Sequence, residues 1–407
     1  MFKICVCISS LIILAGCATY QNKVAPARDE LRAGQCAPAL QKLDELVNKA
    51  DGDQLVYLME YGTALQICKD YEQSNKVFLK ADKLSDQLDY HSASRVVGAT
   101  LLNEEMIQYK GDTFEKLFIN AAAALNYLQL GLQDDALVEV RRINDKFKKL
   151  TAEDNNRKFE LNSFTQYLSG LIWEMDQKYD DACISYKAAY KLDQTYRGVA
   201  LDMLRGCWLA RRTQEFEQMV KEVQPTEAEL KNVKQKSKNE IIFIYMQGWG
   251  PQKQARPEHR TFPYLVPVPS VTKTLEIEFD GNKLQSQPVY SVEKAAIQTL
   301  DADFASLMAR RAGSFVAKAV VADQIRQKDK ALGDIAWLVM YASERADLRQ
   351  WSMLPQTIQV IRFVPQGNVG TVHLKGIDYS GNITETFEDV DLTSLKKKKI
   401  YLVRSLR

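Results

Sequence analysis

Small residues recur at a 12-residue offset along the first half of the chain, and this spacing constrains the fold more than any other feature of the sequence. Large apolar residues, several of them aromatic, follow the small positions by three or four residues. In a helical hairpin, a small residue lets the second helix approach closely, and apolar side chains fill the groove beside it. The pattern predicts a series of helical hairpins, with a plain helical bundle as the alternative. The clearest copies pair Gly62 with Ser74, Ala124 with Ala136 and Gly170 with Ala182, and weaker copies begin at Ala27 and Cys207.

The best copy, which contains Gly170, Trp173, Ala182 and Tyr186, resembles a tetratricopeptide repeat. The resemblance covers the segment 20–225 and implies an α-solenoid whose concave groove holds a peptide or helix of a protein partner. Successive copies begin 35, 62, 46 and 37 residues apart, whereas the family repeat has about 34 residues. The widest gap predicts an extra helix at Tyr90–Gln108.

The N-terminus has the features of an export signal. Lys3 precedes a mostly apolar run that ends in Leu14-Ala15-Gly16-Cys17, which gives a charge, a short apolar core and small residues before a cleavage site. These four residues resemble the lipobox of bacterial lipoproteins, and an ordinary signal peptide with a chance cysteine is the alternative. The resemblance implies cleavage between Gly16 and Cys17, a diacylglyceryl group on the Cys17 thiol, and acylation of the new amino terminus. By resemblance to the sorting of enterobacterial lipoproteins, Ala18 in place of an aspartate favours the outer membrane. We expect the body to lie in the periplasm.

Four cysteines besides Cys17 remain after cleavage. In the register of the tetratricopeptide resemblance, Cys36 starts the second helix of one pair and Cys68 ends the first helix of the next. Those two points should lie close together, so the register predicts a Cys36–Cys68 disulfide in an oxidising compartment. Cys183 and Cys207 fall in adjacent helices and predict a second disulfide, with buried free thiols as the alternative.

The chain divides into segments of different composition. We expect a signal peptide at 1–16, a lipidated tether at 17–24, repeats at 25–225, a linker or last helix at 226–239, and an α+β C-terminal domain at 240–407.

Within the C-terminal domain, the Pro- and Gly-rich segment 248–269 predicts an extended loop, and 291–347 has helical periodicity. Strands followed by helices and further strands predict a β-sandwich-like sheet with a helical insertion. The strands are expected at 240–246, 271–279, 283–290, 357–364, 369–377 and 400–403.

The sequence offers no constellation that marks a reaction. The three histidines, His91, His259 and His373, fall in different regions without metal-ligand spacing. A net charge of +2 argues against nucleic acid as a partner. We therefore expect no enzymatic activity, no metal, no cofactor and no small-molecule substrate.

Two segments contain residue types that are common at binding sites. Arg349 and Trp351 are of the types enriched at interface hot spots, but we favour a structural interpretation, in which Asp347 pairs with Arg349 and Trp351 covers the core. Trp249 and Arg256 lie in the long loop 248–269, and long loops are often functional, although this one can equally wrap the core.

From about Ile241 onward, the chain resembles a family of uncharacterised bacterial lipoproteins that combine tetratricopeptide-like helices with a C-terminal domain of this type. The resemblance implies no known activity and a neighbourhood of outer-membrane lipoproteins that serve cell-wall synthesis or secretion. We therefore expect a lipid-anchored periplasmic scaffold that binds another envelope protein, and the alternative is a wall-binding module or envelope hydrolase that acts through 240–407. The matching residues are Tyr245–Gly248 with Pro251, then Glu344, Ala346, Asp347, Arg349, Trp351, Leu354 and Pro355, then Pro365 with Gly367.

Overall fold

The computed structural model of the chain describes residues 20–49, 51–92, 108–153, 162–235, 239–342, 345–365, 370–393 and 397–407. The expected signal peptide, the expected lipidation site at Cys17 and nearly all of the expected helix Tyr90–Gln108 lie outside these residues.

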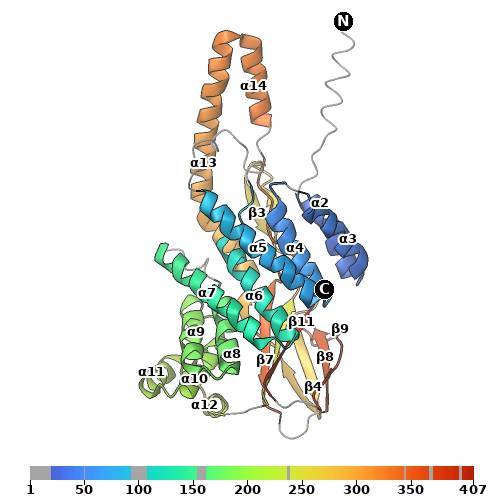
Figure 1. Cartoon of the computed structure of the whole chain (residues 1–407), viewed down its shortest axis with the longest axis vertical. Coiled ribbons are helices and arrows are strands. Elements are labelled where there is room, and N and C mark those ends of the chain that lie inside the picture. The colour runs from blue at the N-terminus through green and yellow to red at the C-terminus, as the bar shows by residue number, and fades with distance from the viewer. Residues whose placement is uncertain are drawn as a thin grey trace.

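The first half of the described chain is helical, and ten of its helices pair as successive hairpins (Figure 1). Each hairpin packs on the next, so the predicted tetratricopeptide-like helical region is confirmed. A last short helix fills the segment expected to be a linker or helix. The helices are α2 (Tyr20–Arg32), α3 (Cys36–Val47), α4 (Gln54–Ile67), α5 (Tyr71–Ser92), α6 (Thr113–Gln129), α7 (Gln133–Glu153), α8 (Ser163–Met175), α9 (Tyr179–Leu192), α10 (Arg197–Leu209), α11 (Thr213–Val223) and α12 (Glu227–Val233).

The glycines of the repeat pattern make room for the aromatic residues of the same pattern. A Cβ atom on Gly62 would lie 2.6 Å from the Phe78 ring, and one on Gly170 would lie 2.5 Å from the Tyr186 ring. Contacts this short are not tolerated between heavy atoms, so only glycine lets these rings pack against the first helix of their hairpin. Ser74, 12 residues after Gly62, donates a hydrogen bond to the Gly62 carbonyl oxygen at 2.7 Å.

The first described helix begins inside the segment that we expected to be a tether. Tyr20 and Val24 are both buried, and the Tyr20 hydroxyl donates to the Gln350 carbonyl oxygen at 2.8 Å. The chain is therefore fixed to the folded body from Tyr20 onward.

Disulfides join Cys36 to Cys68 and Cys183 to Cys207, the two pairs that the repeat register brings together. The first joins the start of α3 to the end of α4, and therefore links one hairpin to the next.

We predict that the denatured mature protein has no reactive thiol among these four cysteines when no reductant is present. The measurement is a thiol titration in denaturant, with a reduced sample as the control that should return four thiols. Two or more thiols in the unreduced sample would contradict the pairing.

The C-terminal half contains two β-sheets packed face to face, so the predicted sandwich-like architecture is confirmed (Figure 1). One sheet has the order β11-β1-β7-β6, with β1 and β11 parallel, and the other has the order β10-β8-β4-β5, with β9 beside β8. Phe243, Ile277, Phe363 and Leu374 belong to the core between them. The strands are β1 (Ile241–Gln247), β4 (Thr274–Phe279), β5 (Asn282–Gln285), β6 (Gln287–Ser291), β7 (Thr357–Phe363), β8 (Thr371–Ile377), β9 (Ile383–Thr386), β10 (Val390–Asp391) and β11 (Lys399–Arg404).

The segment predicted as an extended loop contains a short hairpin instead. Strands β2 (Gln252–Ala255) and β3 (Pro263–Val266) pair antiparallel, and Arg256 N donates to the Phe262 carbonyl oxygen at 2.9 Å. The proline content did not exclude a hairpin, because a proline at the first position of a strand does not prevent the strand from pairing.

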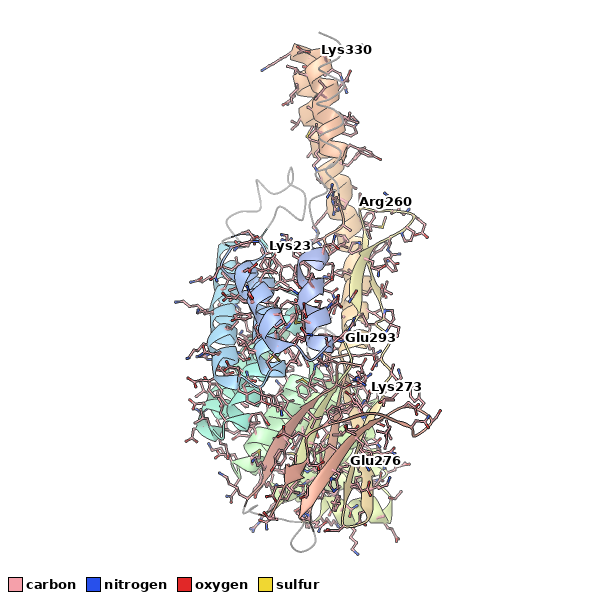
Figure 2. All side chains as sticks on the ribbon, turned by 90° about the vertical axis from the view of Figure 1, so that its right-hand side faces the viewer. Lys23, Arg260, Lys273, Glu276, Glu293 and Lys330 are labelled. Atoms are coloured by element: carbon pink, nitrogen blue, oxygen red, sulfur yellow. A yellow bond between two sulfur atoms is a disulfide. The ribbon has the colours of Figure 1, made fainter. Side chains whose placement is uncertain are left out.

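The helical insertion is a hairpin that projects from the body (Figure 1). It consists of α13 (Val292–Lys328) and α14 (Lys330–Ala342). We call the part beyond the buried Leu307, residues 308–342, the arm. In Figure 2, Lys330 marks its tip, and Lys23 and Arg260 lie at the end of the body from which it projects. No helix in the described part of the chain combines the length and apolar character that a membrane crossing requires.

Candidate functional site: the inner face of the repeats

The first helices of the repeat hairpins, α4, α6, α8 and α10, form an inner face that lies against the C-terminal half of the chain (Figure 1). Helix α6 contacts β11, and helices α8 and α10 contact β6. Helix α4 is buried on all sides from Leu55 to Gln66, apart from the half-buried Tyr61, as expected for a helix covered by partners on every face. The concave groove that we expected to hold a peptide or helix of a partner is therefore occupied by this chain's own C-terminal domain.

Two buried carboxylates on this face hold an extended segment of the chain. Glu60 accepts hydrogen bonds from the backbone nitrogens of Ser352 at 2.7 Å and Met353 at 3.0 Å. Glu115 accepts one from the Trp351 nitrogen at 2.7 Å. Three consecutive amides are thus bound by side chains that precede them by more than 230 residues. The oxygens of a carboxyl group accept hydrogen bonds from backbone N–H groups, so the inner face binds this segment as it would bind a peptide.

The Trp351 side chain occupies the centre of the same contact. It is 3% exposed, and its indole N–H donates to Thr63 Oγ1 at 2.8 Å. Its ring packs against Phe78 and Phe118, with centroids 5.8 and 5.7 Å away. Trp351 therefore fills a pocket in the repeats and is not available to a partner.

The ion pair expected between Asp347 and Arg349 is present and reaches the repeats. Arg349 Nε and Nη2 lie 2.9 and 2.7 Å from the two Asp347 oxygens. Arg349 Nη1 lies 3.1 Å from Asp53 Oδ1, at the start of α4. The structural interpretation of this run therefore holds, with the addition that its partner is the repeat domain.

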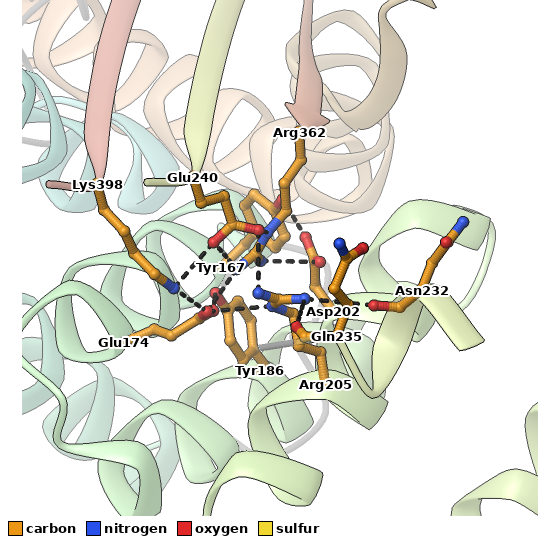
Figure 3. A network of polar contacts seen from close by, with 10 residues as sticks. All are labelled: Tyr167, Glu174, Tyr186, Asp202, Arg205, Asn232, Gln235, Glu240, Arg362 and Lys398. Carbon is orange, nitrogen blue, oxygen red and sulfur yellow. Dashed lines mark hydrogen bonds and ion pairs between the residues drawn. The ribbon is translucent and has the colours of Figure 1, made fainter. Parts of the chain in front are cut away.

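A second cluster, of buried charges, joins the four-stranded sheet to α8 and α10 (Figure 3). Arg362 of β7 contacts Glu174, Asp202 and Glu240. Lys398 Nζ lies 2.7 Å from Glu174 and 2.8 Å from Glu240. The cluster contains three cations and three carboxylates, the third cation being Arg205, so its formal charge balances.

Two buried tyrosines, one of them from the repeat pattern, also take part in this charge cluster. The Tyr186 hydroxyl, whose ring packs on Gly170, donates to Glu174 at 2.9 Å, and the Tyr167 hydroxyl donates to Asp202 at 2.6 Å. Burial alone would raise the pKa of Glu174, but Arg362, Lys398 and Arg205 together hold that pKa well below its ordinary value. The carboxylate is therefore ionised at neutral pH and fully engaged.

Glu115 carries the opposite shift. Burial, reinforced by the nearby charge of Asp112, raises the pKa of Glu115 to about 7. Between pH 4.5 and 7, Glu115 is protonated in the folded protein but ionised in the unfolded chain. The free energy of unfolding must therefore fall as pH rises through that range.

We predict that Glu115→Gln flattens this pH dependence. A pKa shift of one unit corresponds to about 1.36 kcal/mol. Between pH 4.5 and 7.5, the unfolding free energy of the wild type should therefore fall by about 2–3 kcal/mol more than that of the variant. Urea unfolding at both pH values measures it, with Glu72→Gln, at an exposed position of α5, as control. Equal losses in wild type and Glu115→Gln would contradict the assignment.

The four candidate binding residues do not form one exposed surface. Trp249 is 2% exposed and donates its indole N–H to the Leu406 carbonyl oxygen at 2.9 Å. Arg256 is half-buried over the Phe304 ring, 4.7 Å from its centroid. Arg349 and Trp351 are brought together, but on the buried inner face.

Besides Arg349 and Trp351, charged residues that were not predicted from the sequence hold the two halves together. Their signal is a lone charge in an apolar run: Glu60 follows Leu-Val-Tyr-Leu-Met, Glu174 follows Leu-Ile-Trp, and Arg362 lies within Ile-Gln-Val-Ile-Arg-Phe. A charge placed there is buried, and buried charges need partners.

The fold and this inner face define a class: a tetratricopeptide-like helical-repeat protein whose concave face is occupied by its own C-terminal domain. Among solved structures, the chain is similar to "MamA 41-end" from Desulfovibrio magneticus RS-1, with 16% identity over 51% of this chain and 89% of that one, at a TM-score of 0.31. It is also similar to a tetratricopeptide repeat protein from Parabacteroides merdae, with 14% identity over 53% of this chain and 70% of that one, at a TM-score of 0.34. No protein-family model and no curated protein matches the sequence.

Proposed function

We propose that this protein is a lipid-anchored scaffold of the cell envelope, without enzymatic activity, that binds another envelope protein at the seam between its repeats and its C-terminal domain. The proposal rests on the observation that the concave face is already filled. The surface that remains available to a partner is therefore formed by both halves of the chain together. The N-terminal lipobox resemblance supports an outer-membrane anchor at Cys17 with the body in the periplasm.

A cleft of about 410 Å³ opens at this seam. The repeats contribute Lys69, Tyr71 and Gln129, and the C-terminal domain contributes Phe387 and Tyr401. Gln129 also pairs with the outer edge of β11, since its side chain bonds the Ile400 carbonyl oxygen and the Leu402 nitrogen, each at 3.2 Å. Side chains of both halves therefore frame one recess that combines aromatic surface with charged groups, as protein interfaces do.

The test is photo-crosslinking in cells, with a photoreactive phenylalanine placed singly at Tyr71 or Tyr401 of the full chain. The same residue at Ile184, exposed on α9, is the matched control. We expect one discrete crosslinked species from both cleft positions and none from Ile184. No adduct at the cleft, or recovery of cell wall material instead of a protein, would contradict the proposal.

The full chain is needed because the repeats alone would expose their inner face. Residues 20–236 without the C-terminal domain would leave Glu60, Glu115 and Glu174 without their C-terminal partners, next to uncovered aromatic rings. A protein captured by that fragment would have bound a surface that is buried in the full chain.

A further inference from the structure

The arm, residues 308–342, exposes apolar side chains on both of its helices. Val316 is 62% exposed, Val320 is 52% exposed, Leu338 is 65% exposed and Val339 is 61% exposed. Nine of the seventeen large hydrophobic side chains exposed in the described part of the chain lie in the arm, so this is where its uncovered apolar surface is concentrated. The nine are Met308, Phe315, Val316, Val320, Leu332, Ile335, Leu338, Val339 and Tyr341.

The start of the described chain lies at the base of the arm. Gln21 Nε2 donates to the Leu348 carbonyl oxygen at 3.1 Å, six residues after α14 ends. Arg311, at the start of the arm, donates to the Arg345 carbonyl oxygen at 2.7 Å. Figure 2 shows Lys23 of α2 at the end of the body from which the arm projects toward Lys330.

A lipid on Cys17 would therefore hold the base of the arm close to the membrane. Three chain steps separate Cys17 from Tyr20, and they span at most about 11 Å. The part of α13 from Arg311 to Lys328 rises by about 25 Å. Because Tyr20 is fixed to the body, this short tether would keep the base of the arm next to the bilayer, and the arm is long enough to reach the membrane surface.

The composition of the arm suits this position. Residues 308–342 contain six Lys and Arg against three Asp, and a basic surplus favours an anionic lipid surface. Trp337 packs against Phe315 at 5.0 Å and beside Tyr341 at 6.2 Å, and Trp and Tyr are enriched at the membrane interface. The charged tip, from Arg326 to Lys330, suits the head-group layer.

We infer that the exposed apolar faces of α13 and α14 lie in the interfacial layer of the membrane that carries the Cys17 lipid, as a second point of attachment beside the acyl chains. The inference rests on the anchor of the proposed function. It also predicts how the body is oriented, with the arm end nearer to the lipid than the β-sandwich.

The test uses the full acylated protein in vesicles of phosphatidylethanolamine and phosphatidylglycerol. An environment-sensitive fluorophore is attached to Val316→Cys or Leu338→Cys, and to Ile184→Cys as a control on the repeats that is also more than half exposed. We expect blue-shifted emission at both arm positions, and quenching by bromine-labelled acyl chains that is several-fold stronger than at Ile184.

Equal quenching at all three positions would overturn the inference. Unquenched arm labels that show energy transfer between molecules would also overturn it, because a second copy would then cover the face. Acylation is measured separately, by mass spectrometry of the N-terminal peptide. If Cys17 carries no lipid, the proposed anchor is wrong. Sedimentation with the same vesicles then tests the arm by itself, and protein that stays in the supernatant overturns the inferred contact between the arm and lipid.

Discussion

Replacing Arg362 by methionine is expected to lower the free energy of unfolding by about 3–5 kcal/mol, because it leaves buried carboxylates without a counter-charge. Arg362 is the group shared by Glu174, Asp202 and Glu240. Without it, two cations face three carboxylates in a region where all six side chains are at most 15% exposed. Urea unfolding at pH 7 measures the loss.

Two further variants distinguish this effect from a simple change of volume. Arg362→Met combined with Asp202→Asn restores the charge balance and should recover part of the loss, because the sites are coupled. Arg212→Met removes a cation from the more exposed pair with Asp180 and should cost at most about 1 kcal/mol. Similar losses from Arg362→Met and Arg212→Met would contradict the role of the cluster.

The pH dependence of the Arg362 variant has a definite sign. In wild type, the cations hold the pKa of Glu174 below its ordinary value, so its stabilising contribution is present above about pH 4.5 and is lost as pH falls further. In Arg362→Met, an unbalanced carboxylate is instead destabilising when ionised. The difference between wild type and variant should therefore shrink on acidification.

Trp351→Ala is expected to cost about 3–5 kcal/mol, the range for deleting a fully buried tryptophan. The change removes the ring that packs between Phe78 and Phe118 and leaves Thr63 without its donor. Equilibrium unfolding in urea is the measurement.

Trp351→Phe serves as the conservative counterpart, because it keeps an aromatic ring and loses mainly the hydrogen bond, for about 1–2 kcal/mol. Trp208→Ala is the matched control, since Trp208 is 40% exposed on α10, and it should cost much less. If Trp351→Ala were as mild as Trp208→Ala, the segment would not be bound in the repeats as described.

Local sequence patterns predict most of the fold. The glycine and aromatic positions at Gly62 and Gly170 follow from hairpin geometry, and the Asp347–Arg349 pair involves neighbours two residues apart. The strands at 240–246 and 357–364 follow from short apolar runs, and the structure places β1 and β7 there. Each of these features depends on contacts between residues that lie within a few tens of positions of one another, or on burial alone.

What the inner face binds could not be predicted in this way. Glu60 and Glu115 bind amides 236 to 293 residues further along the chain, and no local periodicity encodes such a pairing. The groove of a repeat domain looks the same in sequence whether its occupant is another protein or a later part of the same chain. The lone buried charges, such as Glu174 and Arg362, mark that some partner exists but do not identify it.

The central claim, that the concave face of the repeats is filled by residues 349–354, is tested most directly by hydrogen exchange of the Trp351, Ser352 and Met353 amides in the native protein. Each donates to a buried carboxylate, so their protection should match that of the α4 and α6 helices and should be lost only with global unfolding. Fast exchange of these amides, with α4 and α6 still protected, would show an open groove and contradict the account.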